Sequence, residues 1–218
     1  MKSARASTQV NRLNEPGGVL RSHLEAGGGA QLPEWDAVQR AIRFVRVGPG
    51  NTVFDQGVTH PFVYGVRRGV VKLCYLDASG HEWIKSFSSE GAYFASISAL
   101  EPKGLTSFAA IALEQCELER LSFVPVAALA SRHLAWSQAL SHMTMAFAAR
   151  KERRERELLT LNAEDRYLTF CKDHPDLADR IPQKALARHL GVTPVGLNRI
   201  VIRIRRRDGG VRVRPTVR

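Results

Sequence analysis

The chain has 218 residues, of which 44% are hydrophobic and 24% charged, a composition typical of a globular protein with one large or two modest domains. No window approaches the roughly 18 apolar residues of a membrane span, and the first residues lack the apolar run of a signal peptide, so we expect a cytoplasmic protein. The formal net charge of +11 and the isoelectric point of about 10.2 favour a polyanionic partner, such as nucleic acid or an acidic membrane face.

Nearly all of the excess positive charge lies at the C-terminal end. Residues 180–218 contain eleven Lys or Arg and one acidic residue, Asp208, so they carry +10 of the net charge. An excess confined to one segment is expected for contact with a phosphate backbone. A solvated basic tail is the alternative, but these residues alternate with apolar positions at helical spacing, which a tail lacks.

The first 132 residues divide into two parts. Residues 1–31 are rich in Gly, Ser and Asn, and we expect them to be a poorly ordered N-terminal extension. Residues 32–132 contain short apolar or alternating runs, such as RFVRV and FVYGVRRGVVKLCYL, separated by the turn sequences GPGN, DASG and EPKG. This spacing predicts an all-β sandwich or barrel.

One long helix is predicted for residues 133–161, where the apolar spacing changes from that of strands to that of a helix. Trp136, Leu140, Met143 and Phe147 recur at steps of four, three and four. We expect the helix to pack on its own β-domain and to pair with a second copy through a different face, and these four residues are assigned to the dimer interface. A helix of the domain core is the alternative.

Residues 162–218 predict a small α-domain. Helices are expected over AEDRYLTFCKDHP, near DLADRI, and over PQKALARHL, while DGGVRVRP indicates a turn followed by a short strand.

The stretch KALARHLGVTPVGLNRIVIRIRRR has the pattern of a helix-turn-helix. Ala187 is the small residue expected where the helices cross, and Gly191 suits a turn that needs positive φ. Thr193 can cap the second helix, and Pro194 suits its first position. Inward-facing positions are Leu197, Ile200 or Val201, and Ile204. The side chains expected to contact DNA are Gln183, Lys184, Thr193, Pro194, Val195, Asn198, Arg199, Ile202, Arg203 and Arg206, with the recognition helix over about 194–206 in the major groove.

Two stretches resemble the Crp/Fnr superfamily of transcription regulators, which includes the cyclic AMP receptor protein. GNTVFDQGVTHPFVYGVRRGVVKL is similar to the opening strands of a cyclic-nucleotide-binding β-roll, and IPQKALARHLGVTPVGLNRI is similar to the DNA-binding unit. The resemblance covers about residues 35–215. It implies an α+β fold with an N-terminal β-roll (jelly roll) sensor domain, a long dimerisation helix and a C-terminal winged helix-turn-helix. It also implies a homodimeric, sequence-specific transcription regulator without enzymatic activity, with double-stranded promoter DNA and RNA polymerase as expected partners.

The resemblance fails where the family's cyclic-nucleotide-binding members hold the nucleotide. Those members have a Gly-Glu pair for the ribose and an Arg-Ser pair for the phosphate, but Ala95 and Ser96, then Thr106 and Ser107, stand at these positions. A lost ionic contact costs on the order of 2–5 kcal/mol, so we do not expect cyclic AMP to bind in the usual way. Ser96, Thr106 and Ser107 remain the candidate effector pocket. No cofactor is predicted, and the effector is left open.

The recognition helix departs from the family too. Many members carry a Glu followed four residues later by an Arg, whereas here Val195 replaces the Glu and Arg199 keeps the Arg. Valine can contact a thymine methyl group but cannot accept a hydrogen bond from the amino group of cytosine, so a different target sequence is expected.

Three other functions are alternatives to DNA-binding regulation. A haem or thiol sensor would use Cys74, His81 or Cys116, although cysteines in apolar strands are usually core residues. The family's iron–sulfur cysteine cluster is missing, because no cysteine precedes Cys74. An enzyme of the cupin type would need clustered ligands, yet His60 and His81 stand alone, so no metal site is expected. A regulator acting by protein contact alone would not need the basic segment.

Overall fold

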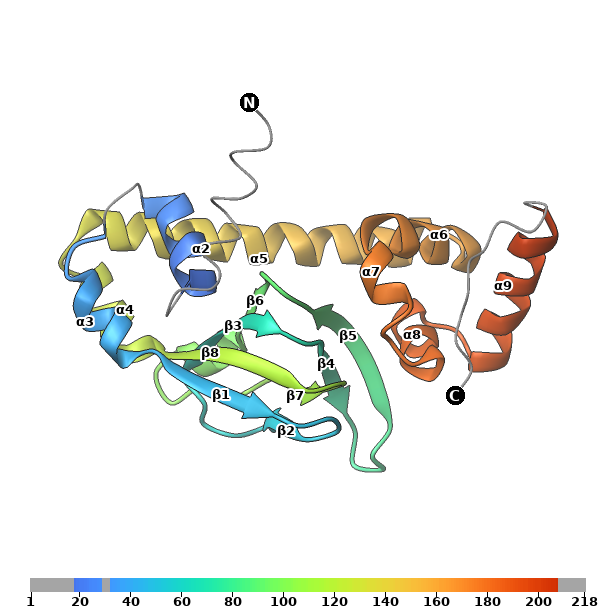
Figure 1. Ribbon diagram of the computed structural model, residues 1–218, viewed down its shortest axis with the longest axis horizontal. Helices are drawn as coiled ribbons and strands as arrows, with labels where there is room; N and C mark the ends of the chain where they lie inside the picture. The colour runs from blue at the N-terminus through green and yellow to red at the C-terminus, as the bar shows by residue number, and fades with distance from the viewer. Residues whose placement is uncertain (1–17, 29–31, 208–218) are drawn as a thin grey trace.

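The computed structural model describes residues 18–28 and 32–207 (Figure 1). Its β-domain is a sandwich of two four-stranded sheets with orders β1-β8-β3-β6 and β2-β7-β4-β5, in which every strand pair is antiparallel. The strands are β1 (Arg43–Val47), β2 (Thr52–Phe54), β3 (Phe62–Arg68), β4 (Val71–Leu76), β5 (Glu82–Ser88), β6 (Tyr93–Phe94), β7 (Ala109–Ala112) and β8 (Cys116–Ser122). The predicted β-roll is confirmed.

The strands form where short apolar runs meet turns that tolerate positive φ. Gly50 in GPGN and Gly80 in DASG have φ of +77° and +78°, so each allows the chain to reverse at low cost. Side chains from both sheets fill the interior, with Tyr64, Phe94 and Phe108 almost wholly buried. This apolar burial is the main stabilising term of the sandwich.

Helices surround and extend the β-domain. They are α2 (Gly18–Gly28), α3 (Trp35–Ala41), α4 (Phe123–Ala130), α5 (Leu134–Thr160), α6 (Ala163–Asp173), α7 (Pro175–Ala178), α8 (Gln183–Leu190) and α9 (Pro194–Arg207), with a short 3-10 helix at Ile97–Leu100. The long helix α5 lies across the sandwich and leads into the α-domain, whose last helix, α9, stands at the far end of the molecule (Figure 1). No helix within residues 18–28 and 32–207 is both long and apolar enough to cross a membrane.

The prediction of a poorly ordered N-terminal extension is wrong for residues 18–28, because these residues form α2. Glu119 on β8 is fully buried and accepts hydrogen bonds from the backbone N–H groups of Val19 and Leu20, at 3.2 and 2.9 Å. These bonds satisfy donors that every helix leaves open at its first turn. Gly65 allows the close approach, since a Cβ there would lie 3.0 Å from Val19. Residues 1–17 and 29–31 lie outside the described part.

Two further helices, α3 and α4, were not predicted. α3 is short and buries Trp35 and Val38. α4 contains Pro125, which reads as a helix breaker but lies in the first turn, where no intrahelical N–H donor is needed. Position within the helix, not composition, makes this proline harmless.

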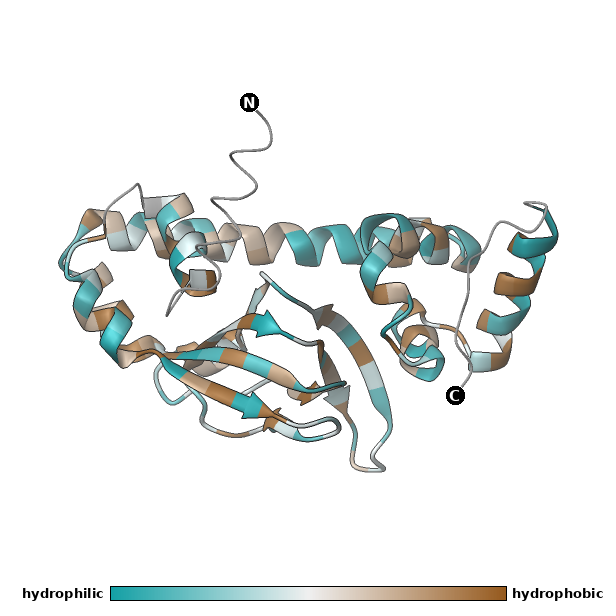
Figure 2. Cartoon of the chain, in the orientation of Figure 1, coloured by the Kyte–Doolittle hydropathy of each residue, from teal (hydrophilic) through white to brown (hydrophobic). Residues whose placement is uncertain are grey.

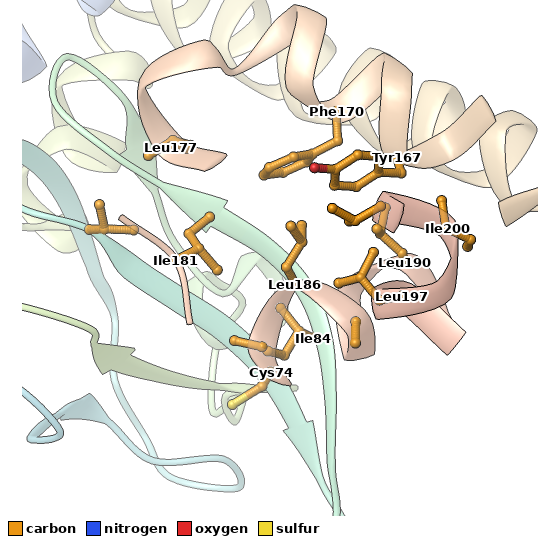
Figure 3. Packing of buried hydrophobic residues seen from close by; sticks show 14 of the residues in the cluster. Cys74, Ile84, Tyr167, Phe170, Leu177, Ile181, Leu186, Leu190, Leu197 and Ile200 are labelled. Carbon is orange, nitrogen blue, oxygen red and sulfur yellow. The ribbon is translucent and has the colours of Figure 1, made fainter. Parts of the chain in front are cut away.

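The α-domain shares a core with the β-domain instead of standing apart. Tyr167 and Phe170 of α6 pack with Leu186 and Leu190 of α8, and the same cluster includes Ile84 of β5 (Figure 3). The α-domain is therefore docked on the sheet that contains β4 and β5.

Candidate nucleic-acid interface

The helix-turn-helix has the local geometry that its sequence predicts. Gly191 ends α8 in the left-handed region with φ of +70°. The Thr193 hydroxyl accepts a hydrogen bond of 3.0 Å from the N–H of Gly196, which caps α9, and Pro194 occupies its first position. These contacts set the turn between the two helices without help from distant residues.

The inner face of α9 is buried as predicted. Leu197, Ile200, Val201 and Ile204 belong to the shared core, and Ala187 is fully buried. Because four apolar side chains hold one face of the helix, rotation about its own axis would expose them at about 1.5–3 kcal/mol each. The opposite face is thereby fixed toward solvent.

The outer face of α9 presents all of its predicted DNA contacts together. Val195, Asn198, Arg199, Ile202, Arg203 and Arg206 are exposed, as are Thr193 and Pro194 at the turn and Lys184 on α8, while Gln183 is half-buried. Arg199 has no ion pair with any residue of the described chain, whereas Arg203 bonds Glu164 of α6 at 3.3 Å. Arg199 is thus available for a guanine edge, and Arg203 must leave or share Glu164 to reach a phosphate.

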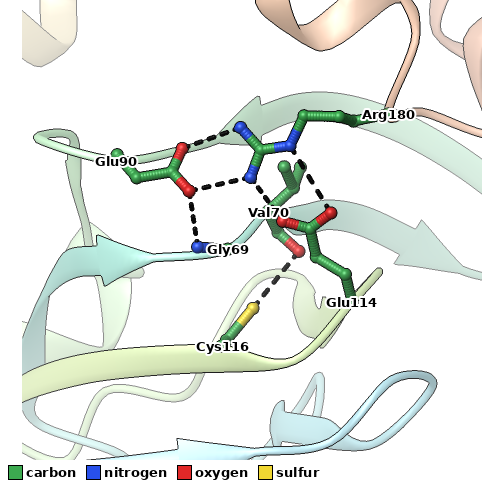
Figure 4. Close-up of polar contacts among 6 residues, drawn as sticks. All are labelled: Gly69, Val70, Glu90, Glu114, Cys116 and Arg180. Atoms are coloured by element: carbon green, nitrogen blue, oxygen red, sulfur yellow. Dashed lines mark hydrogen bonds and ion pairs between the residues drawn. The ribbon is translucent and has the colours of Figure 1, made fainter.

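Arg180, in the segment before α8, clasps two carboxylates of the β-domain (Figure 4). Its Nη1 and Nη2 donate to the two oxygens of Glu90 at 2.9 and 2.7 Å, and its Nη2 also donates to Glu114. Although partial burial opposes the shift, the bonds from Arg180 and from the Gly69 N–H lower the pKa of Glu90 to about 2. Glu90 is therefore ionised throughout the physiological range.

A second set of contacts joins α8 to β5. Arg188 donates to Glu82 at 2.6 Å, and Glu82 in turn pairs with Lys72 at 2.6 Å. Next to it, His189 is 8% exposed and its Nδ1 lies 3.4 Å from the carbonyl oxygen of Ile84. Burial, with repulsion from Arg154, lowers the pKa of His189 to about 3, so the ring is neutral in the docked state.

The candidate effector residues bond to one another and to the chain. Ser96 Oγ accepts from the Ser107 N–H at 2.9 Å, and the Thr106 hydroxyl donates to the Asp55 carbonyl at 2.5 Å. Ser96 and Thr106 are buried, whereas Ser107 is exposed. Ser96 and Ser107 thus contact each other, whereas Thr106 bonds only the main chain, and none of the three carries the charge that an anionic phosphate would need.

Aromatic rings fill the interior beside these hydroxyls. Tyr64 stacks on Phe94 at 5.2 Å and Phe54 packs against Phe108 at 5.7 Å between ring centroids. His60 bonds the Tyr64 hydroxyl at 2.8 Å, and burial raises the pKa of Tyr64 to about 12. The interior of the sandwich is a packed apolar core at this place.

The sequence assigns the apolar face of α5 to a dimer interface, and this assignment is wrong for Trp136 and Met143. Both are buried within their own chain, Trp136 completely, in a cluster with α2, α3 and α4. Leu140 and Phe147 are half-buried against the same cluster. This apolar face of α5 is turned inward because α2 covers it, and the sequence did not predict α2. For this face, the alternative of a core helix holds.

The two thiols that a haem or thiol sensor would use lie in strands of the sandwich. Cys74 and Cys116 are fully buried in strands, and burial raises the pKa of both thiols, which disfavours the reactive thiolate. His81 lies at the exposed β4–β5 turn. No group of three or more His, Cys, Asp or Glu within the described residues is arranged to hold a metal ion.

Comparison with known proteins agrees with this geometry. The family model described as cyclic nucleotide-binding domain matches residues 44–133, which cover the β-sandwich and α4. No curated protein matches the sequence.

Solved structures match far more of the chain than this one domain. FixK2 from Bradyrhizobium japonicum has a TM-score of 0.69 at 18% identity, covering 77% of this chain and 86% of its own. The c-di-GMP responsive global regulator CLP from Xanthomonas campestris has 0.62 at 18%, covering 80% and 91%. A transcriptional regulator of the CRP family from Thermus thermophilus has 0.57 at 19%, covering 75% and 85%. The chain therefore has the fold of CRP/FNR-type transcription regulators.

Proposed function

We propose that the protein is a homodimeric, sequence-specific DNA-binding transcription regulator of the Crp/Fnr type, acting in the cytoplasm and not as an enzyme. The observation that carries the proposal is the outer face of α9, where a row of exposed polar and cationic side chains is held by a buried inner face. A helix of this shape fits the major groove, where Arg199 can donate two hydrogen bonds to one guanine.

The proposed dimer uses a different face of α5 from the one the sequence suggests. Leu134, Met145 and Leu159 are 73%, 69% and 78% exposed, and their spacings of 11 and 14 residues place them on one stripe of the helix. Ser141 and Met145 line a shallow groove on the same side. Antiparallel or parallel pairing of two such stripes would bury large apolar side chains that otherwise contact water.

An effector other than cyclic AMP bound in the usual way is part of the proposal. The positions that match the family's Gly-Glu and Arg-Ser pairs lack both charged contacts, and aromatic rings occupy the interior beside them. Contact with RNA polymerase is a further expectation of the family resemblance.

Selection of bound fragments from random DNA by the purified protein tests the proposal directly. We expect a two-fold symmetric site whose half-sites lie about one helical turn apart. Arg199→Ala should weaken the selected site by roughly 1–3 kcal/mol while sparing nonspecific DNA. Arg153→Ala, an exposed arginine on α5, is the matched control for lost charge. Equal losses on both kinds of DNA would show that Arg199 holds only phosphate, and failure to enrich any sequence would refute specific binding.

A further inference from the structure

One carboxylate of α6 holds two arginines of α9. Glu164 accepts a hydrogen bond from Nη1 of Arg203 at 3.3 Å and another from Nη1 of Arg207 at 2.9 Å. The two arginines are four residues apart, so they lie on the same side of α9. Arg199, four residues before Arg203, has no ion pair with any residue of the described chain. Glu164 therefore acts on the C-terminal part of the proposed recognition helix.

The two arginines remain open to solvent while they cover the carboxylate. The side chain of Glu164 is 17% exposed, whereas those of Arg203 and Arg207 are 69% and 59% exposed. Hydrophobic and hydrophilic bands alternate along α9, as expected for a helix with one buried and one solvated side (Figure 2). Ion pairs with exposed partners are weak, so either arginine can exchange Glu164 for a phosphate oxygen of DNA.

The cap of α6 is made by other residues. The side chain of Asn162 accepts a hydrogen bond of 3.0 Å from the N–H of Asp165 and donates one of 2.6 Å to the Asp165 carboxylate. Glu164 lies in the same first turn, where the helix dipole favours a negative side chain, but its carboxylate bonds to α9. The bonds of Glu164 thus serve α9 and not the start of its own helix.

A carboxylate at this place affects two kinds of DNA contact differently. Nonspecific affinity comes almost entirely from Lys and Arg side chains that neutralise phosphates, and Glu164 cancels one of the two charges of Arg203 and Arg207. Base edges are read mainly by the N-terminal residues of a recognition helix. Glu164 should therefore weaken phosphate contacts more than base contacts.

We propose that Glu164 is a positioning residue that raises the sequence specificity of DNA binding by holding Arg203 and Arg207 back from the phosphates of nonspecific DNA. This inference rests on the proposed regulator function. At the specific site, base contacts fix the N-terminal part of α9 in the groove, and Arg203 shares Glu164 with the DNA backbone. On other sequences no base contact fixes the helix, so the affinity depends on how readily the two arginines leave Glu164.

Fluorescence anisotropy with the full-length protein tests the proposal, using a duplex obtained by selection and a duplex of shuffled sequence in a series of KCl concentrations. Glu164→Gln should raise the affinity for the shuffled duplex about three- to tenfold. Its plot of log affinity against log salt should steepen by about 0.9 for each phosphate gained. The selected duplex should gain less, so the ratio of the two affinities falls. Glu101→Gln, an exposed glutamate after the 3-10 helix of the β-domain, removes the same charge and should behave like the wild type.

A second set of variants separates the action of Glu164 on the arginines from direct repulsion between Glu164 and DNA. In an Arg203→Gln/Arg207→Gln background, Glu164→Gln should leave the affinity for the shuffled duplex unchanged. The same gain in that background would overturn the proposal, and so would equal gains on both duplexes or an unchanged salt dependence. A purely structural role would lower the melting temperature without changing the salt dependence.

The measurements also distinguish this inference from the proposed function. A wild type that binds both duplexes equally would refute sequence-specific regulation, and the shuffled duplex would still show whether Glu164 restrains the two arginines. A wild type that prefers the selected duplex, together with a Glu164→Gln variant that has the same two affinities, would refute only the role of Glu164.

Discussion

Acidification should loosen the α-domain from the β-domain through His189. The ring is held between Phe87 and Phe170, at 5.2 and 5.6 Å between centroids, and is neutral because burial holds its pKa at about 3. In the unfolded chain a histidine has a pKa of about 6.5. The folded chain therefore excludes a proton that the unfolded chain binds. The free energy of unfolding is unaffected by this difference above pH 6.5, and it falls progressively as the pH decreases toward 3.

The size follows from the two pKa values. At pH 5.0 the unfolded histidine is almost fully protonated and the folded one is not, which costs about 2 kcal/mol relative to pH 7.5. With a urea dependence of about 2–3 kcal/mol per molar, the unfolding midpoint should fall by about 0.7–1 M.

Urea unfolding of wild type and His189→Gln at pH 7.5 and 5.0, followed by circular dichroism, measures this effect. Glutamine does not titrate, so the variant should lose about 2 kcal/mol less than the wild type on acidification, whatever its stability at pH 7.5. All other titrating groups are the same in both proteins. An identical pH dependence in the two proteins would refute the role of His189.

Three other changes test contacts of the fold. Glu119→Ala removes both acceptors from the first turn of α2 and should cost about 3 kcal/mol in urea unfolding, with faster proteolysis after residue 28; unchanged stability would mean that α2 is not held there. Arg180→Met should lower the free energy of unfolding by about 1 kcal/mol, because the ion pair between Arg180 and Glu90 is partly exposed. A double-mutant cycle with Glu90→Gln that shows no coupling would contradict this prediction. Met145→Asp should give monomers in analytical ultracentrifugation, whereas Phe44→Asp, on β1, should not; dimers of both would exclude the proposed face.

The helix-turn-helix could be predicted because its signals are local. Gly191, Thr193 and Pro194 act on backbone groups within four residues, and the apolar spacing of α9 identifies its inner face from the chain alone. The strands were predicted for the same reason, since alternation and turn residues are properties of short segments. The excess charge of the C-terminal segment, likewise, needs only counting.

Contacts between distant residues decided the rest. Periodicity showed that Trp136 and Met143 share an apolar face, but not that α2 covers this face instead of a second copy. α2 itself is held by Glu119, about 100 residues away, and a carboxylate in a strand carries no signal of the helix it will cap. Lys85 of β5 and Lys151 of α5 likewise come near each other only in the folded chain. Short-range interactions determine where helices and strands form. Which face of each helix or strand is buried depends on the other surfaces that lie against it in the folded chain.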